Sequence, residues 1–210
     1  MPDWDNSVAA VTAFAAIVAL GTSVLQMRQS NKQHLFDKRL ASWERVNGLL
    51  ELFAAHRKQL LDEEDGQPDF AIDLEFKWLT NNTFLEQIQT SIIKPLDPQE
   101  QRELHLKLDE IRQTAIEFGF LFKGKQFTTV FRFVSLYRDL LFEMYQYKIL
   151  TDHMTEYAQK FNWTLEKAQD TLHEKVRYKQ LKDTVRQMDD CRVLMQQNNL
   201  LKKISDTIKL

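Results

Sequence analysis

The sequence has little cysteine, glycine or proline: its 210 residues include one, five and four of them, respectively. A single cysteine excludes an intrachain disulfide and a zinc site built from several cysteines. So few glycines and prolines exclude collagen-like and linker-rich chains. The chain has 28 lysines and arginines against 30 aspartates and glutamates, and its net charge of −2 gives no overall attraction to nucleic acid. None of these counts points to a reaction or a ligand.

Charge is absent from one long stretch near the N-terminus. Residues 6–27 contain no lysine, arginine, aspartate or glutamate. A helix of this length rises about 1.5 Å per residue and can cross a hydrocarbon core of about 30 Å. We therefore predict a transmembrane helix over residues 8–27. The alternatives are a buried helix of a globular domain and a cleaved signal peptide, although a signal peptide would begin with basic residues rather than with Asp3 and Asp5.

The residues on either side of this run predict its orientation. By the positive-inside rule, the side that carries the basic residues lies in the cytoplasm. We predict a single-pass protein of the bacterial inner (plasma) membrane, with residues 1–7 as a short tail outside. The basic residues could also contact anionic headgroups, or they could serve the topology alone. Four of them follow the run: Arg28, Lys32, Lys38 and Arg39.

The remainder of the chain is predicted to be mainly α-helical. In residues 28–61, apolar side chains recur every three or four positions, as on one face of a helix, and no proline separates them from the predicted span. We expect one long helix, or two nearly collinear helices, over residues 7–61, with residues 28–61 as a juxtamembrane helix. Residues 62–210 are predicted to form a cytoplasmic helical domain, so that the span continues into a helical bundle.

Local signals place further helices in this domain. Asp97 followed by Pro98 is typical of a helix start. An apolar stripe from Val130 predicts another helix, which ends before Thr151. A last long helix begins near Thr164, and the apolar stripe in its C-terminal part resembles a short coiled-coil seam, packed on this chain or on a second copy.

Two segments have an alternating apolar pattern that is typical of strands, residues 70–78 and residues 118–134. A small sheet is therefore an alternative, but the surrounding residues continue helical patterns and we favour helices. The segment 62–75 holds seven acidic residues and no basic one. We interpret it as an exposed loop, with contact to a basic surface as the alternative.

Residues 119–126 match the spacing Gly-x4-Gly-Lys of a phosphate-binding loop. Such a loop needs serine or threonine after the lysine and a buried strand before the first glycine. Gln126 follows Lys125 here, and the preceding residues have a helical pattern. We therefore interpret the segment as a corner between two helices and expect no nucleotide.

The remaining chemistry-bearing residues are scattered. His105 and Asp109 lie four apart and could share a metal, but a site needs three or four ligands. Arg28 and His34 have the loose spacing seen in some helical ribonucleases, directly beside the predicted span. Cys191 has no histidine near it in the sequence. We therefore predict no catalytic, metal or cofactor-binding residues, and no enzyme.

Aromatic residues gather between positions 118 and 147, interleaved with basic ones. We interpret them as core with a basic rim, and the alternatives are stacking on nucleic-acid bases and docking onto the inner leaflet. A nucleic-acid partner is not expected. The candidate contacts with a membrane surface or a protein partner are Arg28, Lys32, Lys38, Arg39, Lys123, Lys125 and Arg132.

The stretch Leu-Phe-Asp-Lys-Arg at residues 35–39, followed by Trp43 and Glu44, resembles that of uncharacterised bacterial proteins with one N-terminal membrane helix. The aromatic corner at residues 118–124 is similar to a corner between two helices of those proteins. The resemblance covers about a third of the chain. It implies a membrane helix joined to a helical cytoplasmic domain, and it implies no activity.

Two function classes fit these patterns. We favour a membrane-anchored helical interaction module that binds a protein partner, or a second copy of itself, at the cytoplasmic face of the inner membrane. The alternative is a membrane-acting effector of a bacterial defence or toxin system, with the cytoplasmic domain as its sensor. A polar face lining a pore would favour the effector, and the polar residues of the span are too few and too dispersed to predict one.

Overall fold

The computed structural model describes residues 3–62 and 68–209, and of residues 3–13 and 17 it describes the backbone alone. This part of the chain forms α-helices and short 3-10 helices, and it contains no strand. The elements are α1 (Asp3–Leu61), α2 (Ile72–Leu79), η1 (Glu86–Ile88), α3 (Pro98–Leu121), η2 (Lys125–Phe127), α4 (Thr128–Phe161), α5 (Leu165–Thr171), α6 (Glu174–Gln197) and α7 (Leu200–Ile208).

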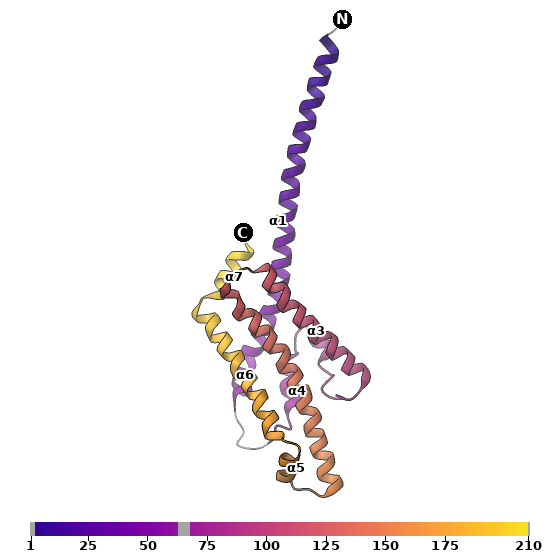
Figure 1. The fold of residues 1–210 in the computed structure, drawn as a ribbon, viewed down its shortest axis with the longest axis vertical. Helices are drawn as coiled ribbons and strands as arrows, with labels where there is room; N and C mark the ends of the chain where they lie inside the picture. Colours follow the sequence, from indigo (N-terminus) through magenta and orange to yellow (C-terminus); the bar gives the residue numbers. More distant parts are fainter. Residues whose placement is uncertain (1–2, 63–67, 210) are drawn as a thin grey trace.

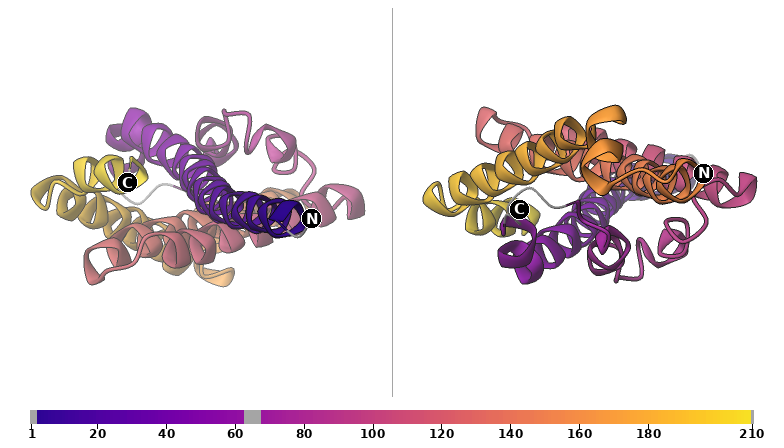
Figure 2. Two further views of the ribbon diagram at one scale, coloured as in Figure 1. Left: turned by 90° about the horizontal axis from the view of Figure 1, so that it is seen from above. Right: turned by 90° about the horizontal axis from the view of Figure 1, so that it is seen from below.

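The helices form a bundle from which the N-terminal half of α1 projects as a single rod (Figure 1). The central helix is α4, which packs against α2, α3, α5 and α6. Seen along the long axis, the C-terminal part of α1 lies on one side of the bundle, and α4 with α6 lies on the other (Figure 2). The second half of α1 therefore packs on the bundle with one face, and the first half has no neighbouring helix (Figure 1).

The side chains of α1 change character along the helix. The described side chains between Phe14 and Lys38 are all exposed, whereas Val46, Leu49, Phe53 and Leu60 are completely buried. These four are spaced three, four and seven residues apart, so they lie on one face of the helix. We expected one long helix or two nearly collinear helices over residues 7–61, and the structure has one, α1, whose C-terminal half is part of the core.

A separate observation concerns the predicted span. Among the residues that the structure describes, no helix contains a stretch long and apolar enough to cross a membrane. A large part of the span predicted over residues 8–27 lies outside the residues whose side chains are described, namely residues 8–13 and 17.

The mainly α-helical fold class predicted from the sequence is confirmed, and so is the helical bundle. The segment 70–78, where a strand was the alternative, forms α2, because Ile72, Phe76 and Leu79 fall on one buried helical face. At the start of α3, the Asp97 carboxylate accepts hydrogen bonds from the backbone N–H groups of residues 99 and 100, at 2.9 and 3.2 Å. The expected N-cap is therefore present.

The C-terminal helices differ from the expectation in length. We expected a helix ending before Thr151, but α4 continues to Phe161, because Thr151 and Met154 are buried against the bundle. The expected long last helix is divided into α5, α6 and α7. His173 and Asn199 interrupt it with left-handed backbones, at φ of 55° and 50°. Each break redirects the chain so that the next helix can pack on the same core.

Two polar contacts join distant parts of the core. The Tyr137 hydroxyl, completely buried in α4, donates a hydrogen bond of 2.6 Å to the carbonyl oxygen of Leu79 at the end of α2. Arg57 of α1 donates two hydrogen bonds to the Asp189 carboxylate of α6, at 2.5 and 2.8 Å, and Arg192 adds a third at 2.8 Å. The hydrogen bond from Arg57 and the charges of both arginines lower the pKa of Asp189.

We expect Tyr137→Phe to destabilise the bundle by about 1–3 kcal/mol, because it leaves the buried Leu79 carbonyl without its donor. The partly exposed Tyr157 of the same helix provides the control, and Tyr157→Phe should cost less than about 0.5 kcal/mol. Urea unfolding followed by circular dichroism measures both. Equal stability of the two variants would contradict a role for this hydrogen bond.

The Asp189 carboxylate should make stability depend on pH. The pKa of this carboxylate is lower in the folded chain than in the unfolded one. Its contribution to the free energy of unfolding is therefore fully present above the usual aspartate pKa and is lost as the pH falls through the lowered pKa. Asp189→Asn should therefore lower the urea midpoint at neutral pH and have little effect in strong acid. Asp190→Asn, at the exposed neighbouring position, is the matched control, and a pH-independent difference between the two would refute the prediction.

Candidate functional site

The end of the bundle from which α1 projects is held together by Arg39. Its guanidinium donates one hydrogen bond of 2.9 Å to the carbonyl oxygen of Thr207 in α7 and another of 3.4 Å to that of Leu121 in α3. Both acceptors lie in the last turn of their helices, where carbonyl groups lack helical partners and attract a cation. Arg39 therefore connects α1 to the C-terminal ends of α3 and α7 through hydrogen bonds.

The chain turns from α3 into α4 at the same end. We call residues 119–131 the α3–α4 corner. Gly124 has a φ of +138°, and a hydrogen bond of 3.0 Å from the Phe127 N–H to its carbonyl closes the turn. The rings of Phe118 and Phe122 stack at 4.3 Å, and Phe127 meets them edge-on at 6.4 and 5.8 Å. These buried rings hold the corner to the core.

The corner is not built as a phosphate-binding loop. The first glycine of the Gly-x4-Gly-Lys stretch lies within α3, and no strand precedes it in the described chain. A phosphate-binding loop presents successive backbone N–H groups after a strand. Here the second glycine, Gly124, is the residue before η2 instead, and the Gln126 side chain lies 2.9 Å from the position that a Cβ at Gly124 would take.

The outer surface of the corner is aromatic and basic. Phe120 is 75% exposed and Phe131 is 41% exposed, while Lys123 and Lys125 also face solvent. A hollow of about 390 Å³ lies beside them, and Phe122, Phe127, Phe131 and Lys125 are among the residues that line it. The next acidic residues along the chain are Glu117 and Asp139, and the four charged residues between them are all basic: Lys123, Lys125, Arg132 and Arg138.

The seven candidate contact residues lie on three parts of the structure: the helix α1, the α3–α4 corner and the first turns of α4. Arg28, Lys32 and Lys38 are exposed on the projecting half of α1, and Arg39 is partly buried by its contacts with α3 and α7. Lys123 and Lys125 are exposed on the corner. Arg132 is exposed one turn into α4, where it donates a hydrogen bond of 3.1 Å to Gln187 of α6. Arg39 therefore has an intramolecular role that its sequence position did not reveal.

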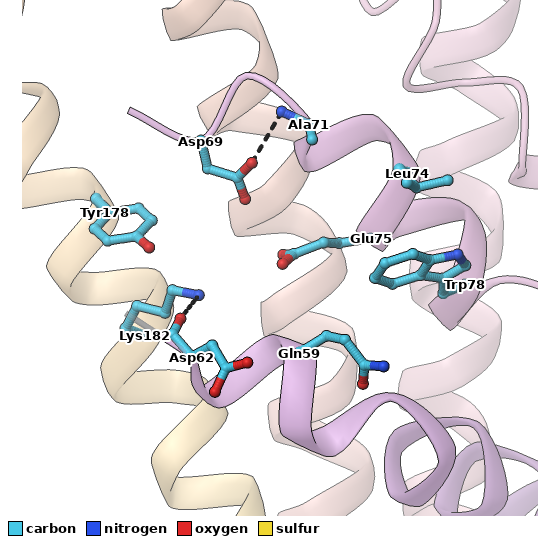
Figure 3. Close-up of a pocket in the computed structure, with 9 residues that line it drawn as sticks. All are labelled: Gln59, Asp62, Asp69, Ala71, Leu74, Glu75, Trp78, Tyr178 and Lys182. Atoms are coloured by element: carbon cyan, nitrogen blue, oxygen red, sulfur yellow. Dashed lines mark hydrogen bonds between the residues drawn. The ribbon is translucent and has the colours of Figure 1, made fainter. Parts of the chain in front are cut away.

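A second hollow lies where α1 ends, between α2 and α6 (Figure 3). Its volume is about 240 Å³, and Asp62, Asp69, Glu75 and Lys182 bring their charged groups toward it. The buried Lys182 ammonium donates hydrogen bonds of 3.0 Å to the carbonyl oxygens of residues 60 and 62. Because this lysine neutralises the C-terminal end of α1, we assign it a structural role. The sequence signal that could have found it is a lysine within the apolar stripe of α6.

The opposite end of the bundle carries an exposed aromatic cluster, formed by Tyr157, Phe161 and Trp163. Phe161 is 52% exposed, and its ring stacks on that of Trp163 at 5.4 Å. The ammonium groups of Lys160 and Lys167 lie over these rings, at 5.4 and 5.2 Å. Aromatic side chains such as these are enriched at protein–protein interfaces. The periodicity of the sequence did not single out this cluster.

The other candidate residues remain apart. His105 and Asp109 are exposed on α3, and the described residues contain no group of three or more metal-ligating side chains. Cys191 is buried in α6, where burial raises the pKa of its thiol. A raised pKa keeps a thiol protonated and makes it a poor nucleophile.

At the corner, we expect Gly124→Val to lower the free energy of unfolding by at least about 1 kcal/mol, because a β-branched residue resists a φ of +138°. Lys125→Ala, at the exposed adjacent position, should change it by less than about 0.5 kcal/mol. Urea unfolding measures both variants, and calorimetric titration with ATP, GTP and Mg²⁺ should give no saturable binding. Micromolar nucleotide binding that Lys125→Ala abolishes would overturn the interpretation of this corner.

Comparison of the chain with protein-family models, curated proteins and solved structures finds no match. Its function therefore has to be inferred from its own residues and their arrangement.

Proposed function

We propose that this protein is a membrane-anchored helical interaction module, held at the cytoplasmic face of a bacterial inner membrane by the N-terminal half of α1. The bundle then serves as the part that contacts a protein partner or a second copy of the chain. The observation that carries the proposal is the projection of α1 from the bundle. The projecting part is an uninterrupted helix, and it includes residues 6–27, which carry no charge.

The exposure of this part of α1 supports a bilayer as its surroundings. Large apolar side chains in water are unfavourable by roughly 25 cal/mol per Å² of surface. Monomeric soluble proteins seldom expose many of them together. A hydrocarbon core would remove this cost, and the uncharged run is long enough to cross one. Six such side chains in the projecting part are 47% or more exposed: Phe14, Val18, Leu20, Val24, Leu25 and Met27.

The residues after the run support the same orientation. The exposed Arg28, Lys32 and Lys38 follow it on the bundle side, while Asp3 and Asp5 precede it. The positive-inside rule favours the bundle on the cytoplasmic side. The C-terminal end of α4 lies at the end of the bundle away from the projecting half of α1 (Figure 1). The aromatic cluster there, with Phe161 exposed, then faces away from the membrane and is open to a cytoplasmic partner.

Carbonate extraction of cell membranes tests the anchor. The full-length chain should stay in the membrane pellet, because an integral helix resists high pH whereas peripheral contacts do not. A chain with Val18→Arg and Leu20→Arg should move to the supernatant, since arginine at the centre of a span costs about 2.5–3.5 kcal/mol per residue. Val176→Arg, an exposed apolar position on α6, is the matched control and should stay in the pellet. Extraction of the unaltered chain would refute the anchor.

A membrane-potential dye separates the module from a membrane-acting effector. For an interaction module, induction of the full-length chain should leave the potential unchanged. Depolarisation that the span variant abolishes would favour the effector.

A further inference from the structure

We propose that the α3–α4 corner rests on the anionic phospholipid headgroups of the membrane in which α1 is anchored. This inference rests on the proposed function and names the surface that the bundle contacts. It would give the bundle a fixed orientation beneath the membrane, rather than leaving it suspended from α1 alone.

The position of the corner within the fold brings it close to the bilayer. Arg39 bonds to Leu121, directly beside the exposed Phe120 and Lys123. Twelve residues of helix separate Met27, at the end of the uncharged run, from Arg39, which corresponds to about 18 Å. The headgroup layer takes up about 5–7 Å of this distance. The corner therefore begins about 11–13 Å from the headgroups when α1 stands upright.

Three effects close the remaining gap between the corner and the headgroups. A lysine side chain extends its ammonium roughly 6 Å from the backbone on a flexible four-carbon stem. Attraction between charges acts over a Debye length of about 8 Å at physiological ionic strength. Transmembrane helices also tilt by about 20° on average, and a tilt toward the corner would bring it nearer to the membrane surface. Lys123 and Lys125 therefore lie within electrostatic reach of the headgroups.

The chemistry of the corner matches a phospholipid surface. Its charged residues are Lys123 and Lys125, and α4 continues with Arg132 on the next turn, so a negative surface is attracted without an opposing carboxylate in this segment. The neighbouring elements also carry exposed acidic residues: Asp37, Glu44 and Glu51 on α1, Asp109 on α3, and Asp206 on α7. Exposed basic residues outnumber exposed acidic ones at positions 14–38 of α1, with Arg28, Lys32 and Lys38 against Asp37, and at positions 200–209, with Lys202, Lys203 and Lys209 against Asp206.

The exposed rings add an apolar component. Phe120 is 75% exposed although it lies in a segment whose other rings are mostly buried. Aromatic side chains beside lysines are enriched at the boundary between headgroups and acyl chains. The hollow of about 390 Å³ beside Phe131 offers apolar walls with Lys125 at its margin. A phospholipid supplies both a negative phosphate for the lysines and apolar acyl carbons for the exposed rings.

Fluorescence quenching in reconstituted vesicles tests the proposal. The full-length chain with Cys191→Ser carries a fluorophore at Phe120→Cys, and a control chain carries it at Phe161→Cys, on the far end of the bundle. The vesicles contain phosphatidylcholine alone or with phosphatidylglycerol, and a spin label on the lipid headgroup is the quencher. The label at position 120 should be quenched with phosphatidylglycerol present, and the label at position 161 should not.

Charge reversal at the two lysines tests the cause of this quenching. Each basic residue near an anionic surface favours the docked state roughly five-fold. Lys123→Glu with Lys125→Glu should therefore lower the ratio of docked to undocked bundles by at least about ten-fold. Circular dichroism checks that the variant is folded. The matched control is Lys202→Glu with Lys203→Glu on α7, which should lower the ratio of docked to undocked bundles less.

The outcomes separate this inference from the proposed function. Flotation of the vesicles in a density gradient shows whether the chain is bound to them. If the chain floats with the vesicles, but its label at position 120 is quenched no more than that at position 161, the docking is overturned and the anchor is left intact. Quenching that persists in phosphatidylcholine alone, or after both charge reversals, also overturns the headgroup contact. A chain that does not float with either kind of vesicle overturns the anchor and the docking together.

Discussion

The continuity of α1 is the constraint on which the rest of the structure depends. One helix serves as the projecting rod and, over its last two dozen residues, as part of the core. Val46, Leu49 and Phe53 are completely buried, so the second half of α1 cannot rotate against the bundle without exposing them. Whatever holds the first half therefore orients the whole bundle, because no hinge interrupts the helix between the two.

The ends of the helices are secured by charged and polar side chains from distant elements. Arg39 bonds to the C-terminal ends of α3 and α7, and Lys182 bonds to that of α1. At the start of α3, the carboxylate of the adjacent Asp97 accepts hydrogen bonds from two backbone N–H groups. These contacts satisfy backbone groups that a helix end leaves without partners. Other helix ends are formed without such contacts: the N-termini of α2, α4, α6 and α7 have no side-chain cap, and α6 and α7 begin at the left-handed residues His173 and Asn199.

The aromatic residues divide into two populations with different roles. Phe118, Phe122 and Phe127 form the buried cluster that fixes the α3–α4 corner, and Tyr137 connects α4 to α2. Phe120 lies only two residues from Phe118 and Phe122 but faces solvent. A rigid buried cluster is what allows an exposed ring and its lysines to be presented in one orientation. The proposed contact with headgroups depends on that rigidity as much as on charge.

The sequence alone determined what depends on neighbouring residues. It predicted the helical class, one long helix or two nearly collinear helices over residues 7–61, and the start of α3 at Asp97, since periodicity and capping are properties of short stretches. It also predicted that Lys123 and Lys125 are candidate contacts. Only the tertiary structure decided that α4 continues past Thr151. It alone placed Arg39 against carbonyl groups 82 and 168 residues away, and left Phe120 exposed. These outcomes depend on which surfaces meet in the folded chain, and the pattern of neighbouring residues does not contain that information.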